Sequence, residues 1–182
     1  MQTLYFVTGN KGKVAEAQTI LGFPIRIANI NLDEIQELDL KKIVTHKVKQ
    51  AYEIIKHPVF VDDVGVYIEA WNGFPGPFIK FIREAGGNKL LIRMLESETN
   101  RNVVVKAAIG FHDGKKVHTF IGDVSGEFIS EERGSGGWGF DPMFKPSHST
   151  QTWGEMTDHD KNIISHRRSA LEKFKKFLQS KK

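Results

Sequence analysis

The sequence predicts an α/β fold with a mixed, twisted sheet and flanking helices. In roughly the first 60 residues, short apolar runs alternate with helical spacings of apolar residues, which is typical of βα units. Two long strand patterns follow at 102–112 and 116–128, around Asp113-Gly114, a frequent hairpin turn. Parallel βα units together with a hairpin indicate a sheet that contains both parallel and antiparallel pairs.

The first half of the chain is predicted to form two strands and two helices. Residues 4–7 predict a buried strand that ends at the turn 8–10. A helix is expected over 13–21, closed by Gly22 and Pro24, and a second strand over 25–30. Asp39 is placed to cap a long helix that ends at His57-Pro58. The apolar face of that helix consists of Ile43, Val44, Val48, Ala51, Ile54 and Ile55.

The second half mixes strand, loop and helix patterns. A short strand at 59–61 runs into Asp62-Asp63, an extended segment covers 64–70, and a Gly/Pro loop occupies 71–77. Residues 78–95 predict two short helices divided at Gly86-Gly87. A glycine-rich loop spans 134–146, and a helix in one or two pieces covers 157–178, with Thr157 and Asp160 placed as a capping box.

Length and composition exclude several classes of protein. There is no repeat, low-complexity tract or long linker, so residues 1–182 are expected to form one domain, with a cleft between two lobes as the ligand site. The chain has no cysteine, which excludes disulfide frameworks, thiol nucleophiles and cysteine zinc sites. It has no apolar stretch of roughly 18 residues and no signal-peptide pattern at its start. We therefore expect a soluble, cytoplasmic protein without a membrane partner.

The charge balance favours an anionic partner only weakly. Lysine and arginine total 26 against 22 acidic residues, a formal net charge of +4. The lysines between 173 and 182 are best explained as a solvated helix face and a frayed end. A nucleic-acid surface usually has a more marked basic stripe with interleaved aromatic residues.

A candidate phosphate-binding turn lies between the first predicted strand and helix. It reads Thr8-Gly9-Asn10-Lys11-Gly12-Lys13. Small residues allow the backbone to approach a ligand, a helix N-terminus attracts anions, and a lysine can reach phosphate oxygens. It is not a Walker A loop, because Val14 stands where that motif has Ser or Thr. A plain turn explains the segment equally well, and any metal would have to be held by carboxylates elsewhere.

Acidic residues form two further candidates. Asp62-Asp63 follow a buried strand, and adjacent strand residues point to opposite faces, so only one of them needs to line a site. Carboxylates at this position can hold a hard cation or orient water, although a turn-initiating pair is the alternative. Glu34, Glu37 and Asp39 form another acidic cluster, in which helix capping best explains Asp39.

The glycine-rich loop presents aromatic residues in a flexible setting. Four glycines, at residues 134, 136, 137 and 139, lie around Trp138 and Phe140. Aromatic rings can stack on a flat base, and Asp141 can accept hydrogen bonds from ring N–H groups. The alternative is that these rings fill a core from a loop.

The last helical segment contains Lys161 and the run Ser165-His166-Arg167. Arg167 falls inside an apolar stripe, so either the helix breaks near Ser165 or Arg167 points into a polar site. The stripe consists of Ile163, Ile164, Ala170, Leu171, Phe174, Phe177 and Leu178. The other histidines show no spacing typical of a metal site.

Taken together, these segments resemble the inosine triphosphate pyrophosphatase family, hydrolases of non-standard purine nucleoside triphosphates. The matching pieces occur in the family's order and nearly end to end. They are Thr8-Gly9-Asn10 with Lys13, Asp62-Asp63 with Gly65, residues 72–76, residues 137–142, and Lys161-Asn162 with Ser165-His166-Arg167 and Ala170-Leu171. The resemblance implies a mixed α/β fold in two lobes around a central nucleotide-binding cleft, a homodimer, and Mg²⁺-dependent hydrolysis of ITP, dITP and XTP to the monophosphate and pyrophosphate.

The resemblance also implies a role for each matching residue. The triphosphate would contact Thr8, Gly9, Asn10, Lys11, Gly12 and Lys13. Glu37 and Asp63 would bind Mg²⁺, with Asp63 also as proton acceptor, and the nearby Glu34 stays open as a metal ligand. The nucleotide and its base would be lined by Trp138, Gly139, Phe140, Asp141, Lys161, His166 and Arg167. Val64 stands where many members have Ser, so that contact would fall to the backbone or solvent.

The implied chemistry agrees with the residue types. A triphosphate carries about four negative charges, which lysines and Mg²⁺ can hold while pyrophosphate leaves. Asp63 can orient or deprotonate a water that attacks the α-phosphorus, and a donor from His166 or Arg167 to the 6-oxo group would discriminate against adenine. Two alternatives stay open: a single-stranded nucleic-acid or nucleotide-binding module without turnover, and a different metal-dependent phosphohydrolase.

Overall fold

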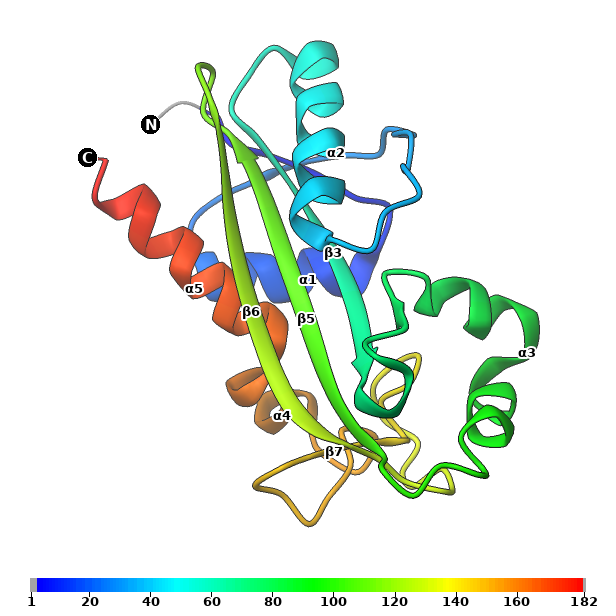
Figure 1. Ribbon diagram of the computed structural model, residues 1–182. Helices are drawn as coiled ribbons and strands as arrows, with labels where there is room; N and C mark the ends of the chain where they lie inside the picture. The colour runs from blue at the N-terminus through cyan, green and yellow to red at the C-terminus, as the bar shows by residue number, and fades with distance from the viewer. Residues whose placement is uncertain (1–2, 182) are drawn as a thin grey trace. The chain divides into compact units, whose positions relative to one another are not determined.

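The computed structural model describes residues 3–181 and has a mixed α/β architecture. Its elements in chain order are β1 Tyr5–Val7, α1 Lys11–Leu21, β2 Arg26–Ala28, α2 Leu40–Ile55, β3 Val59–Ile68, the 3₁₀ helix η1 Glu69–Trp71, β4 Pro75–Gly76, α3 Ile79–Met94, β5 Asn102–His112, β6 Val117–Phe128, β7 Phe144–Pro146, α4 Asp158–Ile164 and α5 His166–Gln179 (Figure 1). No helix within residues 3–181 is long and apolar enough to cross a membrane.

The seven strands form one mixed sheet, which confirms the predicted fold class. The strand order is β2-β1-β3-β5-β6-β7, and β4 pairs with β3. β1 pairs in parallel with both β2 and β3, whereas β3–β4 and β6–β7 are antiparallel. The turn at Asp113 joins β5 to β6, as the hairpin pattern predicted, and the Asp113 N–H donates to the carbonyl of Lys116 at 3.2 Å.

The chain divides into two compact units. The first consists of the segment that ends at Val64, residues 107–122 and the segment that begins at Arg167. The second consists of residues 65–106 and 123–166. Each of β3, β5 and β6 contributes residues to both units.

The core of the first unit packs α1 and α5 against β1, β3 and β5. Leu21 of α1 and Phe174 of α5 belong to the same buried cluster as Phe60 of β3, and the Phe6 and Phe60 rings stack with centroids 4.3 Å apart. α2 packs on β5 through Gly110, where an added Cβ would lie 2.5 Å from the carbonyl oxygen of Val44. Glycine is therefore required at residue 110 by this close approach.

Side-chain caps fix where the helices of the first unit begin. The Asn10 side chain accepts a hydrogen bond from the Lys13 N–H at 3.1 Å, so α1 begins at Lys11, two residues earlier than predicted. Asp39 caps α2 by accepting from the Lys41 N–H at 2.8 Å, as predicted. Gly22, with φ +72°, ends α1 at the expected place.

The second unit has an aromatic core. Phe128, Phe144 and Trp153 are fully buried, and the Phe144 and Trp153 rings lie 4.2 Å apart. α3 leaves helical geometry at Gly87, which confirms the predicted division of this segment. Strand β7 lies inside the stretch expected to be a loop, because three residues among glycines and turns give little strand pattern.

The C-terminal helical segment is divided at Ser165, which lies between α4 and α5. This confirms the predicted break, and it explains why two members of the expected apolar stripe are exposed. Ile163 and Ile164 on α4 are 54% and 41% exposed, because the chain leaves helical geometry at Ser165 and the single continuous helix that the stripe requires does not form. Thr157 caps α4 by accepting from the Asp160 N–H at 3.2 Å, as predicted.

Candidate active site

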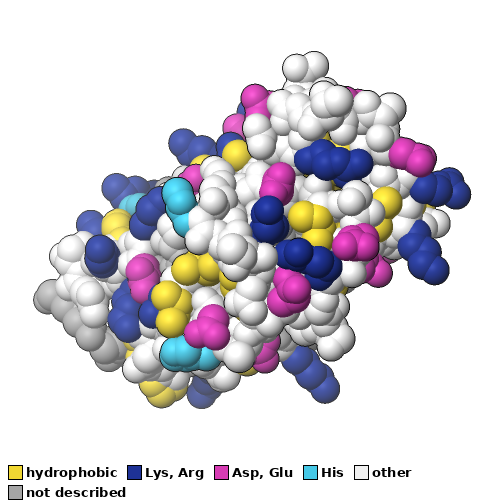
Figure 2. All heavy atoms as spheres, turned by 90° about the horizontal axis from the view of Figure 1, so that it is seen from below, with side chains coloured by type: hydrophobic (Ala, Val, Ile, Leu, Met, Phe, Trp, Pro, Cys, Tyr) yellow, Lys and Arg dark blue, Asp and Glu magenta, His cyan; other side chains and the backbone are white. Residues whose placement is uncertain are grey.

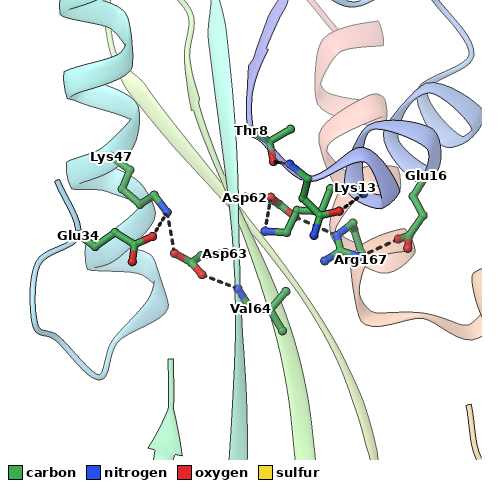
Figure 3. A network of polar contacts seen from close by, with 10 residues as sticks. Thr8, Lys13, Glu16, Glu34, Lys47, Asp62, Asp63, Val64 and Arg167 are labelled. Atoms are coloured by element: carbon green, nitrogen blue, oxygen red, sulfur yellow. Dashed lines mark hydrogen bonds and ion pairs between the residues drawn. The ribbon is translucent and has the colours of Figure 1, made fainter. Parts of the chain in front are cut away.

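The two adjacent aspartates of β3 serve opposite faces of the strand in the first unit. The sequence predicted a strand that ends before these residues, but β3 continues through both of them. Asp62 points toward α1 and Asp63 toward α2 (Figure 3). This alternation follows from the strand period of two, as predicted, and it gives each carboxylate its own set of partners.

Asp62 is the centre of a buried ion-pair network. Its carboxylate binds the Lys13 ammonium at 2.8 Å and the Arg167 Nε at 2.9 Å. A second nitrogen of Arg167 binds Glu16 on α1 at 2.9 Å. Burial by itself would raise the pKa of Asp62, but the positive charges of Lys13 and Arg167 outweigh it and lower the pKa to about 2. Asp62 is therefore a permanently charged anchor for the two cations.

Arg167 points into this polar network, so both explanations offered for it hold: the helix breaks at Ser165, and the guanidinium enters a polar site. Its pKa is raised, because the attraction of Asp62 and Glu16 exceeds the opposing effect of burial. No local pattern in the sequence singled out Glu16. This arrangement assigns Arg167 to holding Asp62 and Glu16, whereas the resemblance had placed it along the base.

The turn 8–13 forms a helix N-terminus with phosphate-binding character. The Thr8 hydroxyl accepts from the Asn10 N–H at 3.1 Å, and Lys11 and Gly12 begin α1. The first turn of α1 carries no acidic residue, so its N–H groups are not neutralised by a local carboxylate. Lys13, expected to reach phosphate, has its ammonium on Asp62 in this structure.

Asp63 lies in a second cluster, on the α2 side of β3. The Lys47 ammonium binds Asp63 at 3.1 Å and Glu34 at 3.0 Å, and Figure 3 shows both carboxylates converging on it. Asp63 also accepts from the Val64 N–H at 2.9 Å. Burial would lower the pKa of Lys47, but the two carboxylates outweigh this and raise it. Lys47 is thus a nearly buried cation between carboxylates from two separate segments.

Lys47 was not among the residues predicted for the site, although the sequence carries a signal for it. Lys47 lies three and four residues from Val44 and Ile43, and directly before Val48, so it borders the apolar stripe of α2. In the structure the Lys47 side chain is only 13% exposed. The same reasoning that singled out Arg167 applies to it.

Glu37 lies in a different environment from Glu34. Its carboxylate accepts from the Leu38 N–H at 2.9 Å and binds the Lys42 ammonium at 2.9 Å. Hydrogen bonding to Lys42 lowers the pKa of Glu37, and the backbone N–H groups of Asp39 and Leu38 add to the effect. The structure places the carboxylate of Glu34, and not that of Glu37, on Lys47, which also binds Asp63. Within residues 3–181, no group of three or more acidic, histidine or cysteine side chains forms a metal cage.

The second unit gathers four of the predicted base-lining residues and adds one that was missed. The buried Lys161 ammonium binds the Asp141 carboxylate at 2.5 Å and lies 5.6 Å and 5.7 Å from the ring centroids of Trp138 and Trp153. Asp141 also accepts from the Trp138 N–H at 2.5 Å. Trp153 was not anticipated, and its ring stacks on His166 with centroids 5.2 Å apart.

Within this group, Trp138 and Phe140 differ in exposure. Phe140 is 4% exposed and packs edge-on against Phe128 at 5.9 Å, so the alternative of a ring that fills a core from a loop applies to it. Trp138 is half-buried. Of the two rings expected to stack on a base, the structure therefore leaves only Trp138 accessible.

Comparison with known proteins finds relatives that match this chain over nearly its whole length. The model of the Ham1 family matches residues 4–177. A "dITP/XTP pyrophosphatase" from Methanosarcina acetivorans is 40% identical, with all of both chains covered. An "Inosine triphosphate pyrophosphatase" from Schizosaccharomyces pombe is 38% identical, covering 100% of this chain and 98% of that one. The solved structure of the Staphylococcus aureus Ham1 protein shares the fold at a TM-score of 0.86 and 24% identity, covering 99% of this chain and 100% of that one. The chain belongs to the Ham1 family.

Proposed function

We propose that this protein hydrolyses non-standard purine nucleoside triphosphates, namely ITP, dITP and XTP, to the monophosphate and pyrophosphate. The observation that carries the proposal is the full-length identity of 40% to a protein named as a dITP/XTP pyrophosphatase. Two features of this chain support it independently. They are the carboxylates that share Lys47 in the first unit, and the Trp138–Lys161–Asp141 group in the second.

The proposed reaction uses Mg²⁺, for which Glu34 and Asp63 are the fitting ligands. Their oxygens already converge on one cation, the Lys47 ammonium, at 3.0 Å and 3.1 Å. Carboxylate oxygens are the protein ligands that Mg²⁺ prefers, usually one or two of them with waters completing its shell. When bound, the ion would neutralise charge on the triphosphate and on the leaving pyrophosphate. We therefore assign Glu34 the metal role that the resemblance gave to Glu37.

Residues of the first unit would bind the triphosphate and prepare water. The N–H groups at the start of α1 suit phosphate oxygens, and Lys11 and Lys13 supply positive charge. Lys47, beside Asp63, can exchange a carboxylate for a phosphate oxygen when substrate arrives. Asp63 would orient the attacking water and accept its proton, with its second oxygen held by the Val64 N–H.

Residues of the second unit would recognise the base. Trp138 is the accessible ring for stacking, and Lys161 holds Asp141 in place to accept from ring N–H groups. His166, fixed by the Trp153 ring, is the candidate donor to the 6-oxo oxygen. Adenine presents an amino donor there, and two opposed donors in a buried site can cost a factor of about 10⁴. Arg167 is not needed for this role.

The alternative of a nucleic-acid-binding module receives less support. Figure 2 shows acidic and basic side chains interleaved on the face drawn, whereas binding to a phosphate backbone favours a continuous basic stripe. That module also assigns no role to Glu34 and Asp63 around Lys47. A homodimer and a cytoplasmic location stay predictions from the resemblance and the sequence.

The metal assignment can be tested with two matched glutamates. We expect Glu34→Gln to reduce Mg²⁺-dependent turnover of ITP at least about 100-fold and to raise the Mg²⁺ concentration for half-maximal rate. Glu37→Gln should stay within about threefold of the wild type, because its carboxylate binds Lys42 and backbone N–H groups. Asp63→Asn should keep the fold and nearly abolish turnover. A strong loss in Glu37→Gln with a normal Glu34→Gln would reverse the assignment.

A further inference from the structure

The loop that carries Trp138 is held from outside by α3. Gly139 has φ +75°, and a Cβ built on it would lie 2.9 Å from the Cζ atom of Arg83. The Arg83 guanidinium therefore packs directly on the Gly139 backbone. The left-handed conformation favours glycine at this position, and the guanidinium occupies the space where a side chain would begin.

Asn88 makes a hydrogen bond to the same residue. Its side-chain amide donates to the carbonyl oxygen of Gly139 at 2.9 Å and also contacts the carboxylate of Glu132. Asn88 comes directly after Gly87, where α3 leaves helical geometry at φ +63°, and both Arg83 and Asn88 are half-buried. The kink in α3 thus separates two side chains that meet the loop at one residue.

We propose that Arg83 and Asn88 are positioning residues for purine recognition, acting through Gly139 on the neighbouring Trp138. The inference rests on the proposed function, since it concerns how the base-recognising loop is held. Neither residue belongs to the motifs that the sequence analysis singled out.

The physical basis is pre-organisation of a glycine-rich loop. Residues 134, 137 and 139 are glycines with positive φ, so the free loop has many conformations to lose when a base binds. Inside the loop, the Asp141 carboxylate ties down the Trp138 N–H, at 2.5 Å. On the other side of Trp138, Asn88 donates a hydrogen bond to the carbonyl oxygen of the next residue, Gly139. Removing that hydrogen bond leaves the ring to be ordered by the ligand, which weakens binding without touching the reacting atoms.

The test compares Asn88→Ala with the wild type by calorimetry, using inosine monophosphate as the probe of the base site. We expect the Kd to rise about three- to tenfold, the effect of one hydrogen bond. The KM for ITP should rise by a similar factor, with kcat within about twofold of the wild-type value. Inhibition by inorganic tripolyphosphate, which has no base, should keep its Ki within about twofold.

Asn102→Ala is the matched control. The Asn102 amide also donates to a glutamate, Glu69, at 2.9 Å in the same unit, but this hydrogen bond joins β5 to η1 and not to the loop. It should leave the Kd for inosine monophosphate within about twofold of the wild type. Arg83→Met keeps an extended side chain but removes the guanidinium. It should raise the Kd for inosine monophosphate, as Asn88→Ala does.

Three outcomes would count against the inference. Equal Kd values in Asn88→Ala and Asn102→Ala would overturn it, and so would an equal loss of tripolyphosphate inhibition, which would indicate a general structural effect. If the wild type binds inosine monophosphate but does not hydrolyse ITP, the proposed reaction is wrong. The Kd values for inosine monophosphate would still decide the role of Asn88 in that case. A wild type that does not bind inosine monophosphate would overturn both.

Discussion

Replacing Asp62 with asparagine should destabilise the protein in a pH-dependent way. The side chain is 6% exposed and anchors Lys13 and Arg167 at 2.8 Å and 2.9 Å. Lowering its pKa from 3.8 to about 2 corresponds to about 2 kcal/mol of folding free energy at pH 7, at about 1.4 kcal/mol per pKa unit. Because the neutral asparagine would remove one of the carboxylates that hold the buried Arg167, the total loss can reach about 5 kcal/mol.

The sign of the pH dependence follows from the lowered pKa. The carboxylate stabilises the folded state fully above the unfolded-state pKa near 3.8, and that stabilisation is lost as the pH falls toward 2. The titrating part should therefore shrink from about 2 kcal/mol at pH 7 to about 1 kcal/mol at pH 3.

The assay is urea unfolding of the wild type and of Asp62→Asn at several values between pH 7 and pH 3, with Asp123→Asn, an exposed aspartate, as the control. We expect the difference in free energy of unfolding between wild type and Asp62→Asn to narrow as the pH falls, and the control to follow the wild type. A difference that is absent at pH 7, or that stays constant down to pH 3, would refute the account of Asp62 as a charged anchor.

Two further substitutions test the second unit. Gly139→Ala should lower the free energy of unfolding by about 1–3 kcal/mol, because alanine is strained at a φ of +75° and its Cβ would displace the Arg83 guanidinium. Gly22→Ala, at a φ of +72° but with its Cβ at an ordinary 3.5 Å from the Lys175 ammonium, should lower it less, and equal losses in thermal unfolding would contradict the packing argument. Lys161→Met should lower the free energy of unfolding by about 3–5 kcal/mol at pH 7, because it removes the Lys161 ammonium from the buried Asp141 carboxylate. The double variant Lys161→Met/Asp141→Leu should recover part of that loss in urea unfolding, and no recovery would contradict the ion-pair explanation.

Periodicity and turn chemistry were sufficient to predict most of the fold. The caps at Asp39 and Thr157, the hairpin turn at Asp113 and the breaks at Gly87 and Ser165 all rest on local rules, which the structure confirms. The start of α1 and the full length of β3 were missed, since a glycine in the first turn of α1 and two charged residues inside β3 weaken the local patterns.

The candidate site was harder to predict, because its geometry depends on partners far apart in the chain. Alternation along β3 correctly separated Asp62 from Asp63, but nothing local indicated that Arg167 would bind a residue 105 positions away. The choice between Glu34 and Glu37 required knowing which of them reaches Lys47. Phe140 and Trp138 have the same local setting, and only packing against Phe128 separates the buried ring from the accessible one.

The most direct test of the proposed function is hydrolysis of ITP, XTP, GTP and ATP by the wild-type protein, with and without Mg²⁺, in an assay that resolves pyrophosphate from orthophosphate. The account predicts pyrophosphate from ITP and XTP, only with the metal present, and little turnover of ATP. Orthophosphate as the product, or equal rates on ATP, would contradict the assigned reaction and the role of the Trp138 loop in selecting the base.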